Sequence, residues 1–277
     1  MELPRTSRSY GSEIEELIVG KGDYIIGGAR SPPFLKLDNA RNRRPVIFGE
    51  AYDDLGLYNE SAASMFSGRQ NDIEEWAVMW KELGADGICL RLTRPDSHEL
   101  VKRIADRTRI PVMVSADTDI LKRTASEVDD SILILYCRDE TQSLEMSSCS
   151  NNHILVANCG DGDPQSLCRR MQELGARNII VDLGKGKMGP SLKTLRSRIS
   201  SFRMDGLNGV PDSQHNIICD ATPSWDEHGP DVTARRASMI EAMTALGAMM
   251  AGADVIVVKG PGAADMARVY GEELADL

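Results

Sequence analysis

The chain has 277 residues, of which 42% are hydrophobic and 27% charged, so it can bury the core of one large α/β domain or of two small domains. Its formal net charge of −10 disfavours binding to nucleic acid or to an anionic membrane, because both are negatively charged. The first ten residues are polar, and the longest apolar stretch, 243–258, is interrupted by Asp254. We therefore expect a cytoplasmic protein with no signal peptide and no membrane span.

The first 44 residues differ in pattern from the rest of the chain. Residues 12–19 predict a short helix, because acidic side chains at its start would favour the positive end of the helix dipole. Residues 24–28 predict a short strand and 31–34 a turn. We expect residues 1–44 to form an extension packed on the outside of a domain that spans 45–277.

From Pro45 onward, short apolar runs alternate with amphipathic segments about every 30 residues. The runs predict buried parallel strands at 46–48, 87–92, 112–115, 132–136, 154–158, 179–182, 217–220 and 255–258. The amphipathic segments predict helices at 73–83, 98–107, 120–128, 141–146, 165–174, 192–202, 233–250 and 263–274. Eight such units favour an α/β fold of the closed (β/α)₈ TIM-barrel type. An open doubly wound sheet is the alternative, although no GxGxxG follows the first strand.

Three junctions repeat the same pattern of a helix that ends at a glycine and leads into a strand. They lie at 83–88, 174–179 and 251–256, and each contains glycine followed by alanine. Glycine adopts the left-handed conformation that ends many helices, and the β-branched residues that follow suit a buried strand. The repetition supports a chain built from equivalent helix-to-strand units.

The cysteines and histidines do not suggest a metal site. The six cysteines contain no CxxC pair and most fall in or beside predicted strands, so we expect reduced core thiols. The four histidines are scattered, and His153 and His215 precede strands, at the face opposite to the expected site.

Polar side chains follow nearly every predicted strand. In a barrel, the carboxyl-terminal ends of the strands carry the active site, so these residues predict a polar ligand or cofactor site. Many of them would also serve as helix caps or solvated loop residues. The loop 182–190 is rich in glycine and lysine. Its glycines would let a ligand approach the backbone closely, and its lysines would supply positive charge to an anionic group. The predicted cofactor-binding residues are Asp53, Arg91, Asp117, Asn158, Asp182, Lys185 and Asp220.

Several weak motifs, taken together, resemble one known family. It comprises the TIM-barrel delta subunit of the acetyl-CoA decarbonylase/synthase complex and the small subunit of the corrinoid iron–sulfur protein. Ile240 and Gly260 depart from the aromatic residue and the histidine of that family. The matching motifs are Ile25 to Gly28 with Pro33 and Phe34, Pro45 with Glu50 to Asp53, Trp76 and Ala77 with 87–92, Val181 with Asp182, Met188 with Gly189, Arg236 with Glu241 and Thr244, and 251–254 with Pro261.

This resemblance implies a barrel subunit that takes part in methyl transfer between a tetrahydropterin and the cobalt of a corrinoid. The corrinoid would be shared with a larger subunit of the corrinoid iron–sulfur type, and a methyltransferase would be a further partner. The cluster would belong to the larger subunit, so none is expected in this chain. Self-association is compatible with this interpretation.

Two other functions remain open at this point. One is a pterin-dependent methyltransferase that acts by itself, because Asp117, Asn158 and Asp182 supply acceptors for the donor edge of a pterin. The other is an unrelated barrel enzyme, such as an aldolase, which would use Lys185 or Lys259 to form a Schiff base.

Overall fold

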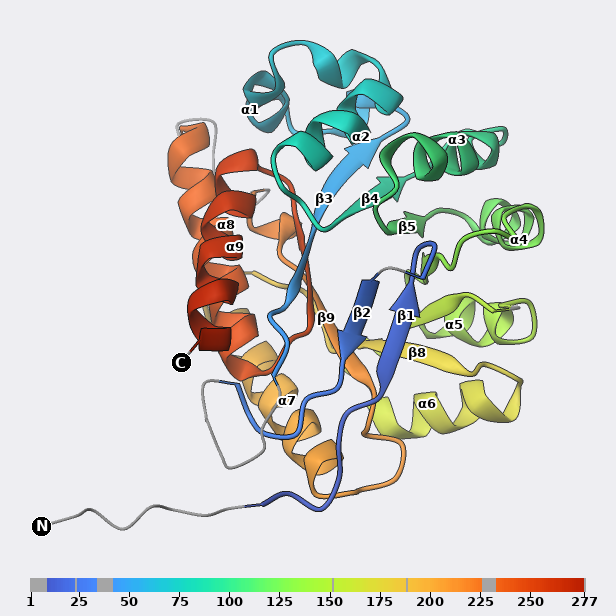
Figure 1. Cartoon of the computed structure of the whole chain (residues 1–277), viewed down its shortest axis with the longest axis vertical. Helices are drawn as coiled ribbons and strands as arrows, with labels where there is room; N and C mark the ends of the chain where they lie inside the picture. Colours follow the sequence, from blue (N-terminus) through green and yellow to red (C-terminus); the bar gives the residue numbers. More distant parts are fainter. Residues whose placement is uncertain are drawn as a thin grey trace, which may run out of the picture.

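The computed structural model describes residues 9–22, 24–33, 42–150, 152–187, 189–225 and 233–276, and these form a closed barrel of eight parallel strands surrounded by helices (Figure 1). Each strand pairs with the next one in the chain, and the last strand closes on the first, with Val255 opposite Val46. The predicted (β/α)₈ barrel is therefore confirmed. Its strands are β3 (Val46–Tyr52), β4 (Gly87–Arg91), β5 (Val112–Ser115), β6 (Ile134–Tyr136), β7 (Ile154–Asn158), β8 (Asn178–Asp182), β9 (Asn216–Asp220) and β10 (Val255–Val258).

The helices lie on the outside of the barrel, one after each strand (Figure 1). The main ones are α2 (Ile73–Glu82), α3 (His98–Thr108), α4 (Thr118–Glu127), α5 (Glu140–Ser147), α6 (Pro164–Glu173), α7 (Pro190–Leu207), α8 (Ala234–Ala251) and α9 (Pro261–Asp276). The sequence did not predict the short elements η1 (Leu55–Leu57), α1 (Glu60–Ala63), η2 (Ser64–Phe66), η3 (Arg69–Asn71) and η4 (Thr222–Trp225).

The segment between β3 and α2 is held by an aromatic cluster. Trp76 and Trp80 lie four residues apart on α2, and both are fully buried, as expected for a packing stripe. Phe66 packs edge-on against both indole rings at centroid distances of 5.2 Å. These edge-to-face contacts anchor the short helices over the side of the barrel.

The three repeated junctions have the backbone conformation that the sequence predicts. Gly84, Gly175 and Gly252 have φ angles of 80°, 109° and 121°, in the region that favours glycine. Each glycine follows a helix and precedes β4, β8 or β10. The same device therefore ends three helices at the amino-terminal face of the barrel.

The N-terminal segment forms a hairpin, not the predicted helix. Residues of β1 (Glu16–Val19) alternate between exposed and buried, and this strand pairs with β2 (Tyr24–Gly27) in antiparallel register. Alternation with a period of two buries one face of a strand, which overrides the helix signal of the acidic residues. The prediction of a helix at 12–19 was therefore wrong, whereas the predicted strand at 24–28 is confirmed.

The hairpin packs against the residues that fill the barrel. Leu17, Val19 and Ile26 belong to the same apolar cluster as Phe48 and Met113, which lie on barrel strands. The N-terminal segment thus covers the amino-terminal mouth of the barrel instead of lying on its outer helices. The opposite end, where the strands finish, is the end that is left for a site.

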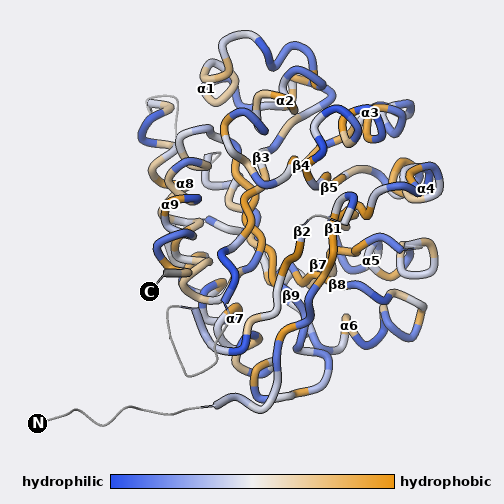
Figure 2. The backbone as a smooth tube through the Cα atoms, viewed as in Figure 1, coloured by the Kyte–Doolittle hydropathy of each residue, from blue (hydrophilic) through white to orange (hydrophobic). Residues whose placement is uncertain are grey.

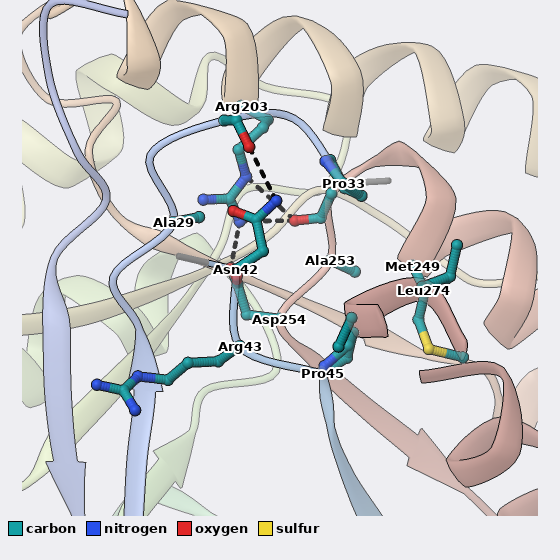
Figure 3. A pocket seen from close by; sticks show the side chains of 13 residues that line it. Ala29, Pro33, Asn42, Arg43, Pro45, Arg203, Met249, Ala253, Asp254 and Leu274 are labelled. Carbon is teal, nitrogen blue, oxygen red and sulfur yellow. Dashed lines mark hydrogen bonds and ion pairs between the residues drawn. The ribbon is translucent and has the colours of Figure 1, made fainter. Parts of the chain in front are cut away.

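A small cavity separates the extension from the barrel at this amino-terminal end (Figure 3). The Asn42 side chain donates to the Ser31 hydroxyl at 2.9 Å, and Arg203 of α7 donates to the Gly252 carbonyl at 2.6 Å and pairs with Asp254. The cavity volume is about 40 Å³, which suits water and not a cofactor.

Some of the motifs that carry the resemblance fall on residues that the structure does not describe. Residues 1–8 and 34–41 lie outside the described ranges, and so does Met188. Phe34 and Met188 therefore contribute to the resemblance through the sequence alone.

Membrane spans and metal-ligand clusters were searched for among the described residues. None of the described helices is long and apolar enough to cross a membrane. Across the described ranges, no three His, Cys, Asp or Glu side chains gather as they would around a metal ion. The six cysteines are free thiols, and Cys149 is the one that is not buried.

Candidate functional site at the strand-end face

An open cleft lies at the carboxyl ends of β6 to β9, where the loops after these strands meet α7. We call it the strand-end cleft. Its volume is about 780 Å³, within the range of small-molecule sites. Four of the seven predicted site residues line it, namely Asn158, Asp182, Lys185 and Asp220. Other lining residues are Tyr136, Arg138, Asp139, Glu140, Cys159, Gly160, Asp161, Leu183, Gly184, Ser191, Thr194, Leu195, Arg198 and Pro223.

Asp182 is the carboxylate at the centre of the cleft. It ends β8, is only 3% exposed, and accepts hydrogen bonds from the Gly184 backbone N–H at 2.9 Å and from the Tyr136 hydroxyl. Burial raises the pKa of Asp182 to about 6, although both hydrogen bonds oppose this rise. A carboxyl group with this pKa exchanges a proton near neutral pH, which suits acid–base work on a bound ligand.

A buried network of charges lies at the strand ends beside the cleft and shares Asp220 with its lining. Arg91 donates from Nε to Glu50 at 2.9 Å and from Nη2 to Asp220 at 2.5 Å. The guanidinium carbon of Arg91 also lies 5.1 Å from the centroid of the Tyr136 ring, in cation–π geometry. Arg91 thus joins the ends of β3, β4, β6 and β9 across the barrel.

Glu50 is the most buried member of this network, at 1% exposure. Burial raises its pKa, and the nearby Arg91 and Lys259 charges oppose that rise. The Lys259 amine lies 3.9 Å from the second carboxylate oxygen of Glu50 and 5.5 Å from the centroid of the Tyr58 ring. Lys259 is therefore buried beside Glu50 and is not among the residues that line the strand-end cleft.

Asn158 and the loop that follows it form the second wall of the cleft. The Asn158 side chain donates to the Arg138 carbonyl at 3.1 Å and accepts from the Gly160 N–H at 3.2 Å. It is half-buried at the end of β7, directly opposite Asp182 in the strand register. The two residues thus place an amide and a carboxylate side by side at the cleft.

The predicted loop of glycine and lysine residues borders the cleft. Lys185 lines the cleft and is exposed, which suits contact with an anionic group. The Gly186 N–H donates to the Asp220 carbonyl at 3.1 Å, and a Cβ atom at Gly186 would lie only 2.5 Å from that oxygen. Glycine is therefore needed here because the loop passes so close to the end of β9.

Arg198 of α7 holds the two loops beside the cleft, and no sequence motif indicated it. Its guanidinium group donates to the carbonyls of Leu183 and Gly162, both at 2.7 Å, and to that of Gly160. A single half-buried cation thus fixes the loops after β7 and β8. Its position in the middle of a long helix carries no signal of this role.

Two other predicted residues, Asp53 and Asp117, do not line the strand-end cleft. Asp53 accepts from the Thr93 and Arg94 N–H groups and from the hydroxyls of Thr93 and Ser97, so it anchors the loop after β4. These bonds lower the pKa of Asp53 although its partial burial acts in the opposite direction. Asp117 is 68% exposed and pairs with Arg138. Neither residue is among those that line the cleft.

A buried carboxylate from α8 fixes the strand end that carries Lys259. Glu241 accepts from the N–H groups of Lys259 and Gly260 at 2.6 and 3.0 Å and from the Trp225 indole at 2.7 Å. Burial raises the pKa of Glu241 to about 8, against the effect of these three donors. A Cβ atom at Gly260 would lie 2.7 Å from Trp225, so a histidine here, as in the resembled family, would collide with this ring.

The described histidines, His98, His153 and His215, are not among the residues that line the strand-end cleft. His153 and His215 are buried at the amino-terminal face, where His153 accepts from the Leu133 N–H at 3.1 Å and His215 lies 3.1 Å from Glu15. No histidine appears among the residues that line the cleft, within the part of the chain that the structure describes. The described residues of the cleft therefore offer oxygen acceptors and cations to a ligand.

These features define a TIM barrel whose polar site lies at the carboxyl ends of its strands. The model of the family described as CO dehydrogenase/acetyl-CoA synthase delta subunit matches residues 37–266. The chain belongs to this family, which confirms the resemblance seen in the sequence.

Curated relatives are similar to this chain over most of its length. The acetyl-CoA decarbonylase/synthase complex subunit gamma of Archaeoglobus fulgidus is 23% identical over 234 residues, which covers 80% of this chain and 48% of the relative. The subunit gamma 2 of Methanosarcina thermophila is 22% identical over 237 residues, with 81% and 48% covered. The chain thus spans about half the length of the curated relatives it matches.

Solved structures show a similar barrel. Dihydropteroate synthase from Vibrio fischeri has a TM-score of 0.61 at 15% identity, covering 94% of this chain and 98% of the other. The enzyme from Thermus thermophilus in complex with 6HMPPP has a TM-score of 0.57 at 14% identity, covering 94% and 98%. At these identities the likeness supports the fold alone.

Proposed function

We propose that this chain is a barrel subunit of an acetyl-CoA decarbonylase/synthase type of complex and takes part in methyl transfer between a tetrahydropterin and a corrinoid cobalt. Membership of the delta-subunit family and the strand-end cleft support this proposal together. The single observation that carries it is the position of Asp182, a nearly buried carboxyl group that faces an open cleft of ligand size.

The groups around the cleft fit the ring of a tetrahydropterin. A pterin presents N–H donors along one edge, and carboxylate and amide oxygens are suitable acceptors. Asp182 and Asn158 supply these acceptors from adjacent strands. In this proposal Asp182 binds the donor edge and exchanges a proton with the ring, because burial brings its pKa to about 6.

A corrinoid would supply a cobalt ion that accepts and donates the methyl group. The described residues around the cleft include no imidazole for the cobalt, and no group of ligands for a cluster occurs elsewhere in the described chain. The chemistry therefore fits a corrinoid carried by a partner, for which a larger subunit of the corrinoid iron–sulfur type is the proposed candidate. This chain would then bind and orient the pterin beside the partner, and a separate methyltransferase is a further proposed partner.

Reconstitution of methyl transfer tests the proposal. The chain would be combined with a corrinoid iron–sulfur protein and a methyltetrahydropterin, and methylcobalt formation followed by its absorbance. We expect Asp182→Ala and Asn158→Ala to lower the rate about 10-fold or more, since each removes a hydrogen bond to a buried ligand edge. The matched control is Asp117→Ala, a carboxylate at another strand end that lies outside the cleft. Wild-type rates for both cleft variants would refute the placement of the site.

The second candidate is a pterin-dependent methyltransferase that acts without a partner. One observation favours it, because the acceptors and the cleft belong to a single chain. Methyl transfer to free cobalamin by this chain alone would support this candidate over the first. A rate that depends on the corrinoid protein would support the first.

A Schiff-base aldolase has weaker support from the geometry. The Lys259 amine lies near Glu50 and Tyr58, and this residue is only 5% exposed. Lys185 is exposed on the loop after β8, and no described feature marks it as a nucleophile. Borohydride trapping with a carbonyl substrate would reveal such an enzyme by a covalent adduct on either lysine.

A further inference from the structure

A layer of polar side chains lies at the carboxyl end of the barrel interior. The barrel strands are hydrophobic along most of their length, and their inward side chains belong to one apolar cluster (Figure 2). Successive residues of a strand alternate between its two faces, so a residue two positions beyond a member of this cluster points inward too. This applies to Arg91, Tyr136, Asp182 and Asp220, which follow Cys89, Ile134, Ile180 and Ile218.

Asp220 is the carboxylate of this layer that a cation compensates. Its Oδ1 atom accepts from the Thr222 N–H at 3.1 Å and from the Thr222 hydroxyl at 2.8 Å, and its Oδ2 atom accepts from Arg91 at 2.5 Å. Hydrogen bonds and an adjacent cation both favour the ionised form of a carboxyl group. Asp220 thus places a fixed negative charge in the lining of the cleft.

Asp182 has a different set of partners. The donors to its carboxylate are two neutral groups, the Gly184 N–H at 2.9 Å and the Tyr136 hydroxyl. Neutral donors offset burial less than a cation does, which agrees with the rise of its pKa to about 6. Two carboxyl groups on the neighbouring strands β8 and β9 therefore differ, because one holds its charge and the other takes up a proton.

Arg91 is connected to both carboxyl groups. Its Nη2 atom donates to Asp220, and its guanidinium carbon lies 5.1 Å from the centroid of the Tyr136 ring, whose hydroxyl donates to Asp182. The bond from Nε to Glu50 at 2.9 Å fixes the plane of the guanidinium group. Arg91 is not itself among the residues that line the cleft, so it acts on a ligand through these neighbours.

We propose that Arg91 is a positioning residue for the strand-end cleft, which keeps Asp220 as the fixed negative charge and leaves Asp182 as the carboxyl group that exchanges a proton. The inference rests on the proposed function only for the use of that proton in methyl transfer. Without Arg91, Asp220 would lose its cation and the Tyr136 ring its cation–π partner. The two carboxyl groups would then share a proton, because the charge of each disfavours that of the other.

The groups that face Asp182 give the effect of Arg91 a defined sign. Cys159 after β7 and Cys219 of β9 act on Asp182, but burial raises the pKa of Cys159 to about 11 and that of Cys219 well above its usual range. Burial also raises the pKa of Tyr136, so these three groups are neutral near pH 6. The positive charge of Arg91 lowers the pKa of Asp182, and its removal should raise that pKa.

An NMR titration of the carboxyl groups in the unliganded chain tests the proposal. Arg91→Gln should raise the pKa of Asp182 by about one unit, the smaller end of the range for loss of a nearby opposite charge. The carboxyl signal of Asp220 should move with that of Asp182 in this variant and stay constant through the Asp182 titration in the wild type. The comparison is repeated in a Glu50→Gln background, which leaves no uncompensated Glu50 charge to unfold the variant.

The matched control is Arg44→Gln at the opposite end of the barrel. Arg44 precedes β3, is partly buried, and donates to both carboxylate oxygens of Asp86 at 2.6 and 2.7 Å. Its loss should destabilise the chain and leave the pKa of Asp182 unchanged. An unchanged pKa of Asp182 when Arg91 is replaced in both backgrounds, or an equal rise in the control, would overturn the proposal.

The pH profile of methyl transfer separates this inference from the proposed function. In the reconstituted complex, the profile of kcat/KM for Arg91→Gln should move by the same amount as the pKa of Asp182. A raised pKa with an unmoved profile would support the role of Arg91 and count against the use of the Asp182 proton in the proposed function.

Discussion

Replacing Arg91 by methionine should show how strongly the stability of the protein depends on the one cation that pairs with Glu50 and Asp220. Arg91 pairs with Glu50, which is 1% exposed, and with Asp220. Without the guanidinium group, Glu50 keeps only the Lys259 amine at 3.9 Å, so it has to be protonated or remain as a poorly compensated buried charge. Protonating a glutamate whose pKa is ordinarily near 4.3 costs about 1.4 kcal/mol for each pH unit above that value, which amounts to about 3–4 kcal/mol at pH 7. Breaking a buried ion pair costs a similar amount, about 3–5 kcal/mol.

Urea unfolding at pH 7 and at pH 5 would measure this loss. We expect Arg91→Met to lower the free energy of unfolding by about 3–4 kcal/mol at pH 7 and by much less at pH 5, where Glu50 takes up a proton readily. The control is Arg138→Met, which removes the 56% exposed partner of Asp117 and should cost about 1 kcal/mol or less. A loss no larger than that of the control, or one that does not vary with pH, would refute the reasoning.

Three further predictions concern carboxyl groups. Because the pKa of Glu241 is raised to about 8, this side chain keeps a proton in the folded protein that it releases above about pH 4.3 in the unfolded chain. The free energy of unfolding of the wild type should therefore fall by up to about 1.4 kcal/mol per pH unit as the pH rises toward 8. Glu241→Gln should flatten this slope when urea unfolding is measured as a function of pH. Tyr136→Phe removes a hydrogen bond that lowers the pKa of Asp182, so an NMR titration should find that pKa above 6, and an unchanged value would contradict the assignment. Asp53→Ala leaves several N–H and O–H donors without an acceptor and should cost about 1–3 kcal/mol in thermal or urea unfolding, with ligand binding at the cleft preserved.

Much of the fold could be predicted because local sequence patterns mark the strands and helix ends of the barrel. Short apolar runs mark the strands, and glycine at the 84, 175 and 252 junctions marks where helices end. The first strand of the hairpin was missed because a four-residue strand carries little signal, and the acidic residues around Glu16 pointed to a helix start. Its burial depends on the barrel mouth, which no local pattern encodes.

The sequence predicted at which end of the barrel the site lies, but not which side chains form it. Sequence identifies which residues follow a strand, but not where their side chains point. Asp182 lines the cleft, whereas Asp53 turns to bind its neighbouring loop. Tyr136, Arg198 and Glu241 were absent from the predicted set because their roles depend on partners far away in the chain. For Tyr136, the one signal in the sequence is its position as an aromatic residue at the end of a strand.

Equilibrium titration of a methyltetrahydropterin into the chain, reconstituted with a corrinoid iron–sulfur protein, tests the central claim most directly. Methyltetrahydrofolate and methyltetrahydrosarcinapterin would be compared by calorimetry. The account predicts saturable binding of at least one of them, weakened about 10-fold or more by Asp182→Ala and unchanged by Asp117→Ala. No binding of either pterin, or equal affinities for the wild type and Asp182→Ala, would contradict the assignment of the strand-end cleft.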